Sequence, residues 1–339
     1  MIRQSEAYKI VKKILKPLYL PIDYFRSGKA KKKLSATLVK NKINPDELDS
    51  PFFIVATRGN LHVVQTCLKF IPSDQDSVMV LNGLERWEQD WARSHLRSKG
   101  FITFPYLIDH WMVIDYLLKW MNKPFGLLDE DCFVFDSDCF KKLIHIPEKT
   151  VMSSYYSYTN SKLGLTFPET MFLFLNTPVI NKLNRHYNID SKVVNWNELS
   201  TAVRNKLLTI GISDQNLPED YKPYFDTLRG IMATGLAEGY QFYYPDGDHS
   251  LRAEKLYHIG AVASVPLRGV RLQKYDHARG AYFWYRALEL FTDEDIKIKY
   301  FEKYGRKNST EILDQIPNSI KDMFLRNDFL SSVERILSS

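Results

Sequence analysis

Three consecutive carboxylates stand between two apolar runs in the first half of this 339-residue chain. They are Asp129, Glu130 and Asp131, and the apolar runs are residues 125–128 and 132–135. An apolar run that ends abruptly in acidic residues is typical of a buried strand with charge at its carboxyl end, where open α/β sheets bind their ligands. Because adjacent carboxylates repel one another and are costly to bury, the cluster favours a bound cation.

The chemistry of such a cation follows from the ligand types. Oxygen ligands without a flanking Cys or His pair suit Mg²⁺ or Mn²⁺, which commonly takes one or two carboxylates together with substrate phosphates. The three carboxylates therefore form a candidate site for such an ion. An acidic turn between two strands is the alternative, and the partners expected further along the chain favour the metal site.

The segments that must position this cluster alternate between strand and helix. Before the cluster, strands are predicted at residues 51–59, 77–83 and 102–104, and helices at residues 61–70, 85–97 and 110–121. After it, strands are predicted at 150–158, 169–178 and 239–244, with a helix opening near Phe225. This alternation predicts a mainly parallel sheet covered on both faces, with the acidic cluster at the end of about the fourth strand.

The order of these motifs resembles GT-A-fold nucleotide-sugar glycosyltransferases, above all bacterial enzymes that build surface polysaccharides. The resemblance covers residues 50–285 and includes the Asp-x-Asp motif at 129–131, a strand that ends at Thr177, Asp226 at a helix start, and His258. It implies an α/β, GT-A-like (Rossmann-like) fold with a mainly parallel sheet flanked by helices. It also implies an enzyme that moves a sugar from a UDP- or GDP-linked donor to a saccharide or lipid-linked acceptor.

The resemblance carries metal-site roles onto three residues. Asp129 matches the carboxylate near the donor ribose or the metal, and Asp131 matches the ligand of the Mn²⁺ or Mg²⁺ that bridges the donor phosphates. His258 matches a late histidine that can complete the metal shell. A histidine set between Tyr and Ile can also be an ordinary core residue, and that alternative stays open.

Donor contacts are expected at the end of the first strand. The resemblance implies Thr57, Arg58 and Gly59 beside the nucleobase, and Arg58 and Lys255 are candidate cations for the leaving diphosphate. A solvated turn residue is the alternative for Arg58. Asp226 stands where a base for the acceptor hydroxyl could be, or it caps its helix, so retention and inversion both stay open.

A rival interpretation comes from another class of enzyme. Haloacid dehalogenase-type phosphatases carry an apolar strand followed by Asp-x-Asp, which would make Asp129 the nucleophile and Asp131 the acid. Against this, several βα units precede the motif, and Cys132 and Phe133 stand where a Thr or Val is expected soon after it. A non-catalytic scaffold is a third alternative.

The net charge of +6 is unevenly distributed. Residues 1–42 contain twelve Lys or Arg against Glu6 and Asp23, which gives +10 there and −4 for the rest of the chain. A basic amphipathic helix beside a lysine cluster can lie on an anionic membrane surface, or it can be a solvated helix on its own domain. Because the basic stretch has no aromatic stacking platform and the body is acidic, no nucleic-acid partner is expected.

The composition also indicates where the protein is located and how the chain divides into domains. With 45% hydrophobic and 25% charged residues the chain is of ordinary globular type, and its three cysteines lack metal-site spacing. No secretory signal or transmembrane stretch is visible, so we expect a cytoplasmic protein, with peripheral attachment at the inner membrane face through residues 1–40 left open. We expect a basic arm at 1–45, a GT-A-like catalytic domain at 46–290 and a helical tail at 291–339.

Overall fold

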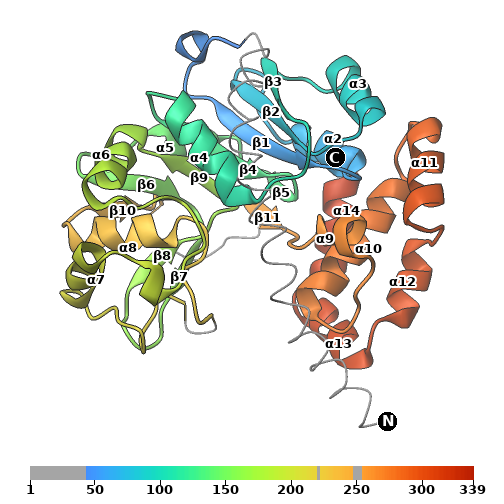
Figure 1. The fold of residues 1–339 in the computed structure, drawn as a ribbon. Helices are drawn as coiled ribbons and strands as arrows, with labels where there is room; N and C mark the ends of the chain where they lie inside the picture. The colour runs from blue at the N-terminus through green and yellow to red at the C-terminus, as the bar shows by residue number, and fades with distance from the viewer. Residues whose placement is uncertain (1–42, 220–221, 247–253) are drawn as a thin grey trace.

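A seven-stranded sheet forms the centre of the molecule in this computed structural model, which describes residues 43–219, 222–246 and 254–339 (Figure 1). Its strand order is β10-β6-β9-β4-β1-β2-β3. The strands of this sheet are β1 (Phe52–Thr57), β2 (Ser77–Asn82), β3 (Gly100–Phe104), β4 (Phe125–Asp129), β6 (Thr150–Ser154), β9 (Phe172–Leu175) and β10 (Gln241–Tyr243). Neighbours pair in parallel except β9, which is antiparallel to both β4 and β6. The predicted α/β class, a mainly parallel sheet flanked by helices, is confirmed.

The strand order creates a switch point beside the acidic cluster. The chain runs outward from β1 through β2 to β3 and then returns through a helix to β4, on the other side of β1. Ligands of open α/β sheets bind at the carboxyl ends of the two strands where the order reverses. Here those strands are β1 and β4, so Thr57 and Asp129 end side by side.

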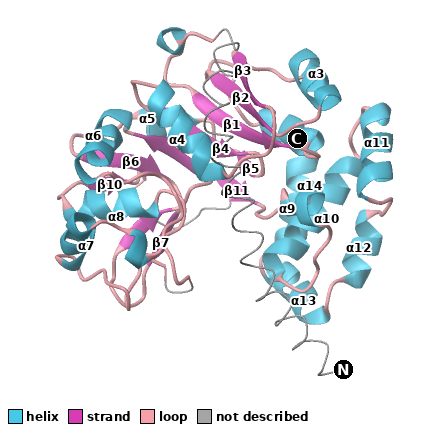
Figure 2. Ribbon diagram, viewed as in Figure 1, coloured by secondary structure: helices cyan, strands magenta, loops and turns pink. Residues whose placement is uncertain are grey.

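Helices cover both faces of the sheet, as Figure 2 shows. They are α2 (Leu61–Leu68), α3 (Arg86–His95), α4 (His110–Trp120), α5 (Asp138–Ile144), α6 (Thr177–Tyr187), α7 (Thr201–Leu208), α8 (Arg229–Ala237) and α9 (Ser264–Arg268), with short 3-10 turns at Pro45–Glu47 and Trp196–Glu198. Side chains alternate along β1: Phe52 and Ile54 enter the core shared with α2, whereas Phe53 and Val55 enter the core shared with α4, α6 and α8. This two-sided burial explains why the strands are apolar throughout.

The C-terminal helices form a separate layer beside the sheet (Figure 1). They are α10 (Tyr275–Glu289), α11 (Glu294–Tyr304), α12 (Ser309–Gln315), α13 (Asn318–Arg326) and α14 (Phe329–Leu337). Helix α10 contacts α2, α9 and α12–α14, and its Phe283 lies in the same core cluster as Cys67 of α2. The predicted division at residue 290 stays a prediction, and the predicted basic arm lies outside the described residues except for 43–45.

Two small antiparallel pairs complete the fold. Strand β5 (Cys132–Val134) pairs with β11 (Leu256–His258), and β7 (Ser157–Thr159) pairs with β8 (Thr166–Pro168). The three cysteines are buried and free. Among the described residues, every helix is too short or too polar to cross a membrane.

Candidate metal and donor site

The acidic cluster forms the tight connection between β4 and β5. Asp129 is the last residue of β4, and Asp131 immediately precedes β5. The β5–β11 register places His258 opposite Cys132, and Ile259 N–H donates to the Asp131 carbonyl at 3.0 Å. A short antiparallel pair therefore brings a distant histidine next to the carboxylates.

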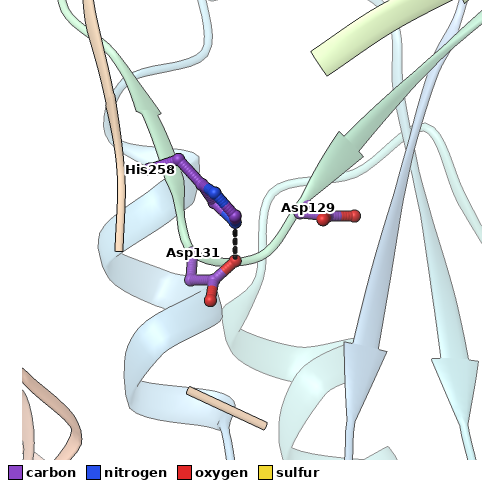
Figure 3. A group of neighbouring side chains, drawn as sticks. All are labelled: Asp129, Asp131 and His258. Carbon is purple, nitrogen blue, oxygen red and sulfur yellow. Dashed lines mark ion pairs between the residues drawn. The ribbon is translucent and has the colours of Figure 1, made fainter. Parts of the chain in front are cut away.

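Asp129, Asp131 and His258 are within reach of one common ion. One ligand atom from each lies within 4.8 Å of the others, and His258 Nε2 is 3.2 Å from Asp131 Oδ1 (Figure 3). Around a six-coordinate Mg²⁺ or Mn²⁺, neighbouring ligand atoms are about 3 Å apart and opposite ones about 4 Å. Two carboxylates and one imidazole are also a donor set that Mn²⁺ accepts. The three residues that the resemblance assigned to the metal are brought together.

Burial and mutual charge shift the pKa values of this group in different directions. Burial raises the pKa of Asp129. Burial would also raise the pKa of Asp131, but the charge and hydrogen bond of His258 lower it below its ordinary value. For His258, burial lowers the pKa, and the nearby Asp131 and Asp129 more than offset that effect and raise it. Asp131 and His258 thus each stabilise the charged form of the other.

The middle carboxylate points away from this group. Glu130 accepts hydrogen bonds from Thr57 N–H at 3.0 Å, from Thr57 Oγ1 at 2.7 Å and from Asn60 Nδ2 at 2.6 Å. Burial raises its pKa to about 8, although these donors favour the ionised form. Glu130 therefore connects the acidic turn to the loop after β1, and nothing in the sequence pattern indicated this role.

A cavity of about 440 Å³ opens beside the cluster. Its lining includes Asp129, Glu130, Asp131 and His258 from the acidic turn and β11, and Thr57 from the end of β1. Such a cavity falls within the range of small-molecule sites. The ends of β1 and β4 thus open into one pocket, as the switch-point rule predicts.

Other parts of the wall were not predicted from the sequence. Asn82 at the end of β2 exchanges two hydrogen bonds of 2.9 Å with the backbone of Ile108, which fixes the loop before α4. Leu107 of this loop and His110, the first residue of α4, line the pocket. Arg268, at the end of α9, also lines the pocket and is a cation that the sequence analysis missed. The only signal for Asn82 was its position at the end of an apolar strand, and Arg268 had none.

The predicted donor contacts have different surroundings. Thr57 lines the pocket, and Gly59 is in the same loop with a φ of +84°. Arg58 lies near Glu85, whose pKa is lowered first by Lys303 and also by Arg58. Lys255 pairs with Asp246 and is not part of the pocket wall. The structure thus groups Thr57 with the metal candidates and gives Lys255 another partner.

Asp226 lies apart from the pocket wall. Its carboxylate pairs with Lys222 and accepts a hydrogen bond of 2.8 Å from Thr227 N–H. Helix α8 begins only at Arg229, with Leu228 at the N-cap position, so the alternative that Asp226 caps this helix is wrong. The helix starts later than predicted because Leu228 adopts a left-handed conformation, with a φ of +64°, just before the first helical turn.

Comparisons with known sequences agree with the resemblance. Residues 32–180 match the family model "StrH glycosyltransferase N-terminal domain". The dTDP-dihydrostreptose–streptidine-6-phosphate dihydrostreptosyltransferase of Streptomyces griseus is 26% identical over 92 residues. That match spans 27% of this chain and 24% of the relative. The phosphatase alternative, with Asp129 as nucleophile, is not favoured by these matches.

The matches to solved structures have low TM-scores and low sequence identity. The glycosyltransferase GlyE of Streptococcus pneumoniae TIGR4 has a TM-score of 0.38 and 10% identity, over 78% of this chain and 66% of that one. The mannosyltransferase PcManGT of Pyrobaculum calidifontis, solved with GDP-Man and Mn²⁺, has a TM-score of 0.35 and 10% identity, over 96% and 97% of the two chains. The sequence matches confirm the predicted resemblance of this chain to nucleotide-sugar glycosyltransferases. The family match covers residues 32–180 and corresponds to the N-terminal domain of that family.

Proposed function

We propose that this protein is a metal-dependent glycosyltransferase that moves a sugar from a nucleoside diphosphate donor to a saccharide or lipid-linked acceptor. The observation that carries the proposal is the group of Asp129, Asp131 and His258, which offers three ligand atoms within 4.8 Å at the wall of a cavity of about 440 Å³. We further propose Mn²⁺ or Mg²⁺ as the ion, and bacterial surface polysaccharide synthesis as the setting.

The residues around the pocket have the charges that such a transfer needs. When bound, a divalent cation would neutralise the leaving diphosphate as the bond to the sugar breaks. Asp129, Asp131 and His258 would hold that cation, and Arg268 at the pocket wall would add positive charge beside the phosphates. The end of β1, with Thr57, Arg58 and Gly59, would contact the nucleobase, and Lys255 is kept as a more distant candidate.

The donor nucleotide and the acceptor are parts of the proposal. The resemblance suggests UDP or GDP, and the name of the Streptomyces relative adds a dTDP-linked donor and a phosphorylated acceptor as candidates. A melting screen with UDP, GDP and dTDP, each with and without Mn²⁺, separates them, because a ligand that binds the folded state raises the melting temperature. We expect one nucleotide to stabilise the protein only when Mn²⁺ is present. Stabilisation by beryllofluoride and Mg²⁺, with no effect of any nucleotide, would support the phosphatase instead.

The proposal also includes a base for the acceptor hydroxyl. Asp226 stays the candidate from the sequence, although its carboxylate pairs with Lys222. If Asp226 is the base, Asp226→Asn should remove sugar transfer while the affinities for Mn²⁺ and nucleotide stay unchanged. Full transfer by this variant would exclude it, and the anomeric configuration of the product would then decide between inversion and retention.

A further inference from the structure

The loop after β1 is held from two sides by buried carboxylates. On the side of the acidic turn, Glu130 accepts from Thr57 N–H, Thr57 Oγ1 and Asn60 Nδ2 at 2.6–3.0 Å. On the other side, Glu88 accepts from Gly59 N–H at 2.7 Å. Four donors of this loop therefore bond to two buried carboxyl groups that come from other parts of the chain.

The C-terminal helices reach the same loop. Trp284 Nε1 of α10 donates to the Gly59 carbonyl at 3.0 Å and to Asn60 Oδ1 at 2.9 Å. Tyr300 of α11 donates to Glu88 at 2.8 Å and accepts from Leu61 N–H at 3.3 Å. Trp284 and Tyr300 are both fully buried. Asn60 is therefore the shared centre, because its side chain contacts Glu130 on one side and Trp284 on the other.

We infer that Glu130 is a positioning residue, which with Asn60 and Trp284 holds the β1 loop in the conformation that binds the donor nucleotide. The flanking carboxylates, Asp129 and Asp131, can reach one common ion with His258, whereas the three hydrogen bonds of Glu130 described above go to the loop. The three adjacent acids thus have two different tasks. The inference rests on the proposed function, since it assumes that this pocket binds the donor.

The chemistry of an amide explains why Glu130→Gln is a sensitive test. Both carboxylate oxygens of Glu130 accept hydrogen bonds, Oε1 from two side chains and Oε2 from Thr57 N–H. A glutamine replaces one acceptor with an NH₂ group that faces a donor, so at least one bond is lost. A buried donor that loses its acceptor is costly, and we expect roughly a 10- to 100-fold loss of nucleotide affinity when this loss falls on nucleotide binding.

The experiment measures Mn²⁺ affinity, nucleotide affinity and melting temperature on the same preparations of the full chain. The nucleotide is whichever of UDP, GDP and dTDP stabilises the unmodified protein with Mn²⁺. For Glu130→Gln we expect the nucleotide dissociation constant to rise roughly 10-fold or more, with Mn²⁺ affinity within about twofold of the original. The matched control is Glu219→Gln, another buried carboxylate, which pairs with Arg229 away from the pocket wall and should change stability alone.

Trp284→Phe tests the contact of α10 with Gly59 and Asn60. It also keeps the inference testable when Glu130→Gln does not fold. It removes the indole N–H but keeps an aromatic ring in the core, so nucleotide affinity should fall while Mn²⁺ affinity stays. Because both residues act through Asn60, the double variant should lose less affinity than the product of the two single losses.

Three results would overturn the inference. Weakened Mn²⁺ binding by Glu130→Gln would make Glu130 a metal ligand and leave the proposed function intact. A lower melting temperature with unchanged nucleotide affinity in both variants would make the network purely structural. An unmodified protein that binds Mn²⁺ but none of the nucleotides would reject the proposed function together with the inference.

Discussion

Nε2 of His258 lies 3.2 Å from Oδ1 of Asp131, although the two residues come from distant parts of the chain. The contact follows from the pairing of β11 with β5, which sets His258 opposite Cys132, one residue after Asp131. A backbone bond from Ile259 to the Asp131 carbonyl reinforces this register. The metal-site proposal therefore depends on a strand pair as much as on side-chain chemistry.

Replacement of His258 by Ala should weaken metal binding without unfolding the protein. The variant keeps both carboxylates but loses one ligand, so the Mn²⁺ concentration for half-maximal activity should rise roughly 10- to 100-fold. Mn²⁺ dependence and melting temperature are measured on one preparation. A core histidine would behave differently, with a lower melting temperature and an unchanged Mn²⁺ midpoint.

Metal affinity should fall as the pH is lowered. A protonated imidazole cannot bind Mn²⁺, and Asp131 and Asp129, which outweigh the opposing effect of burial, raise the pKa of His258. The loss of affinity should therefore begin above pH 6.5, the ordinary value, in titrations between about pH 5.5 and pH 8. His258→Gln should remove this part of the pH dependence, and an identical profile for the variant would contradict the assignment.

The same pair has a consequence for stability in EDTA. Because the folded-state pKa of His258 is raised, its protonated form stabilises the fold fully below the unfolded pKa, and this contribution is lost as the pH rises through the folded pKa. The melting temperature of the metal-free protein should thus lose this contribution as the pH rises above about 6.5. Added Mn²⁺ should restore it at high pH, and the absence of any Mn²⁺ effect there would count against a shared site.

Gly59→Ala should damage the loop after β1. A Cβ at this position would lie 2.5 Å from Cβ of Pro266 and 2.8 Å from the Tyr304 hydroxyl, and the φ of +84° is unfavourable for alanine. Strain of this kind costs about 1–3 kcal/mol. Chemical denaturation should show that loss, with weaker nucleotide binding. Gly164→Ala is the control, since its φ of +64° carries similar strain and its Cβ meets nothing within 4 Å.

Deletion of residues 1–40 should weaken binding to anionic vesicles. Each Lys or Arg near such a surface contributes about 1 kcal/mol, so loss of the arm should lower affinity for phosphatidylglycerol-rich vesicles by at least roughly tenfold. Neutral vesicles are the control, and turnover of a soluble acceptor should change little. Equal vesicle binding by the truncated and intact proteins would disprove the surface-anchor role.

The sheet was predictable because each of its main strands is an apolar run that can be recognised without its neighbours. Each βα unit before the acidic cluster pairs an apolar run with a following helix, and Asp129 ends β4 as expected. Helix α10 was not predicted, since the run from Ala281 to Tyr285 is buried on all sides and shows no amphipathic period. Gly280 also argues against a helix, yet it is needed there because a Cβ would lie 2.7 Å from the backbone of Ala261.

The site was predictable only in part. The resemblance named Asp129, Asp131 and His258, but the register that joins them comes from β5 and β11, which are only three residues long. Long-range contacts create the roles of Glu130, Asn60 and Trp284. Asn60 and Trp284, for example, are more than 200 positions apart in the sequence. No local pattern carries that information, because the packing of α10 against the loop after β1 creates it.

Mn²⁺ titration of the unmodified protein and Asp131→Asn, in the presence of the stabilising nucleotide, tests the central claim most directly. Asp115→Asn is the matched control, since Asp115 is as buried as Asp131 but bonds to Ser191 away from the pocket wall. We predict that Asp131→Asn loses Mn²⁺-dependent nucleotide binding while Asp115→Asn retains it. Unchanged Mn²⁺ and nucleotide affinity in a folded Asp131→Asn protein would contradict the metal site and the metal-dependent transfer built on it.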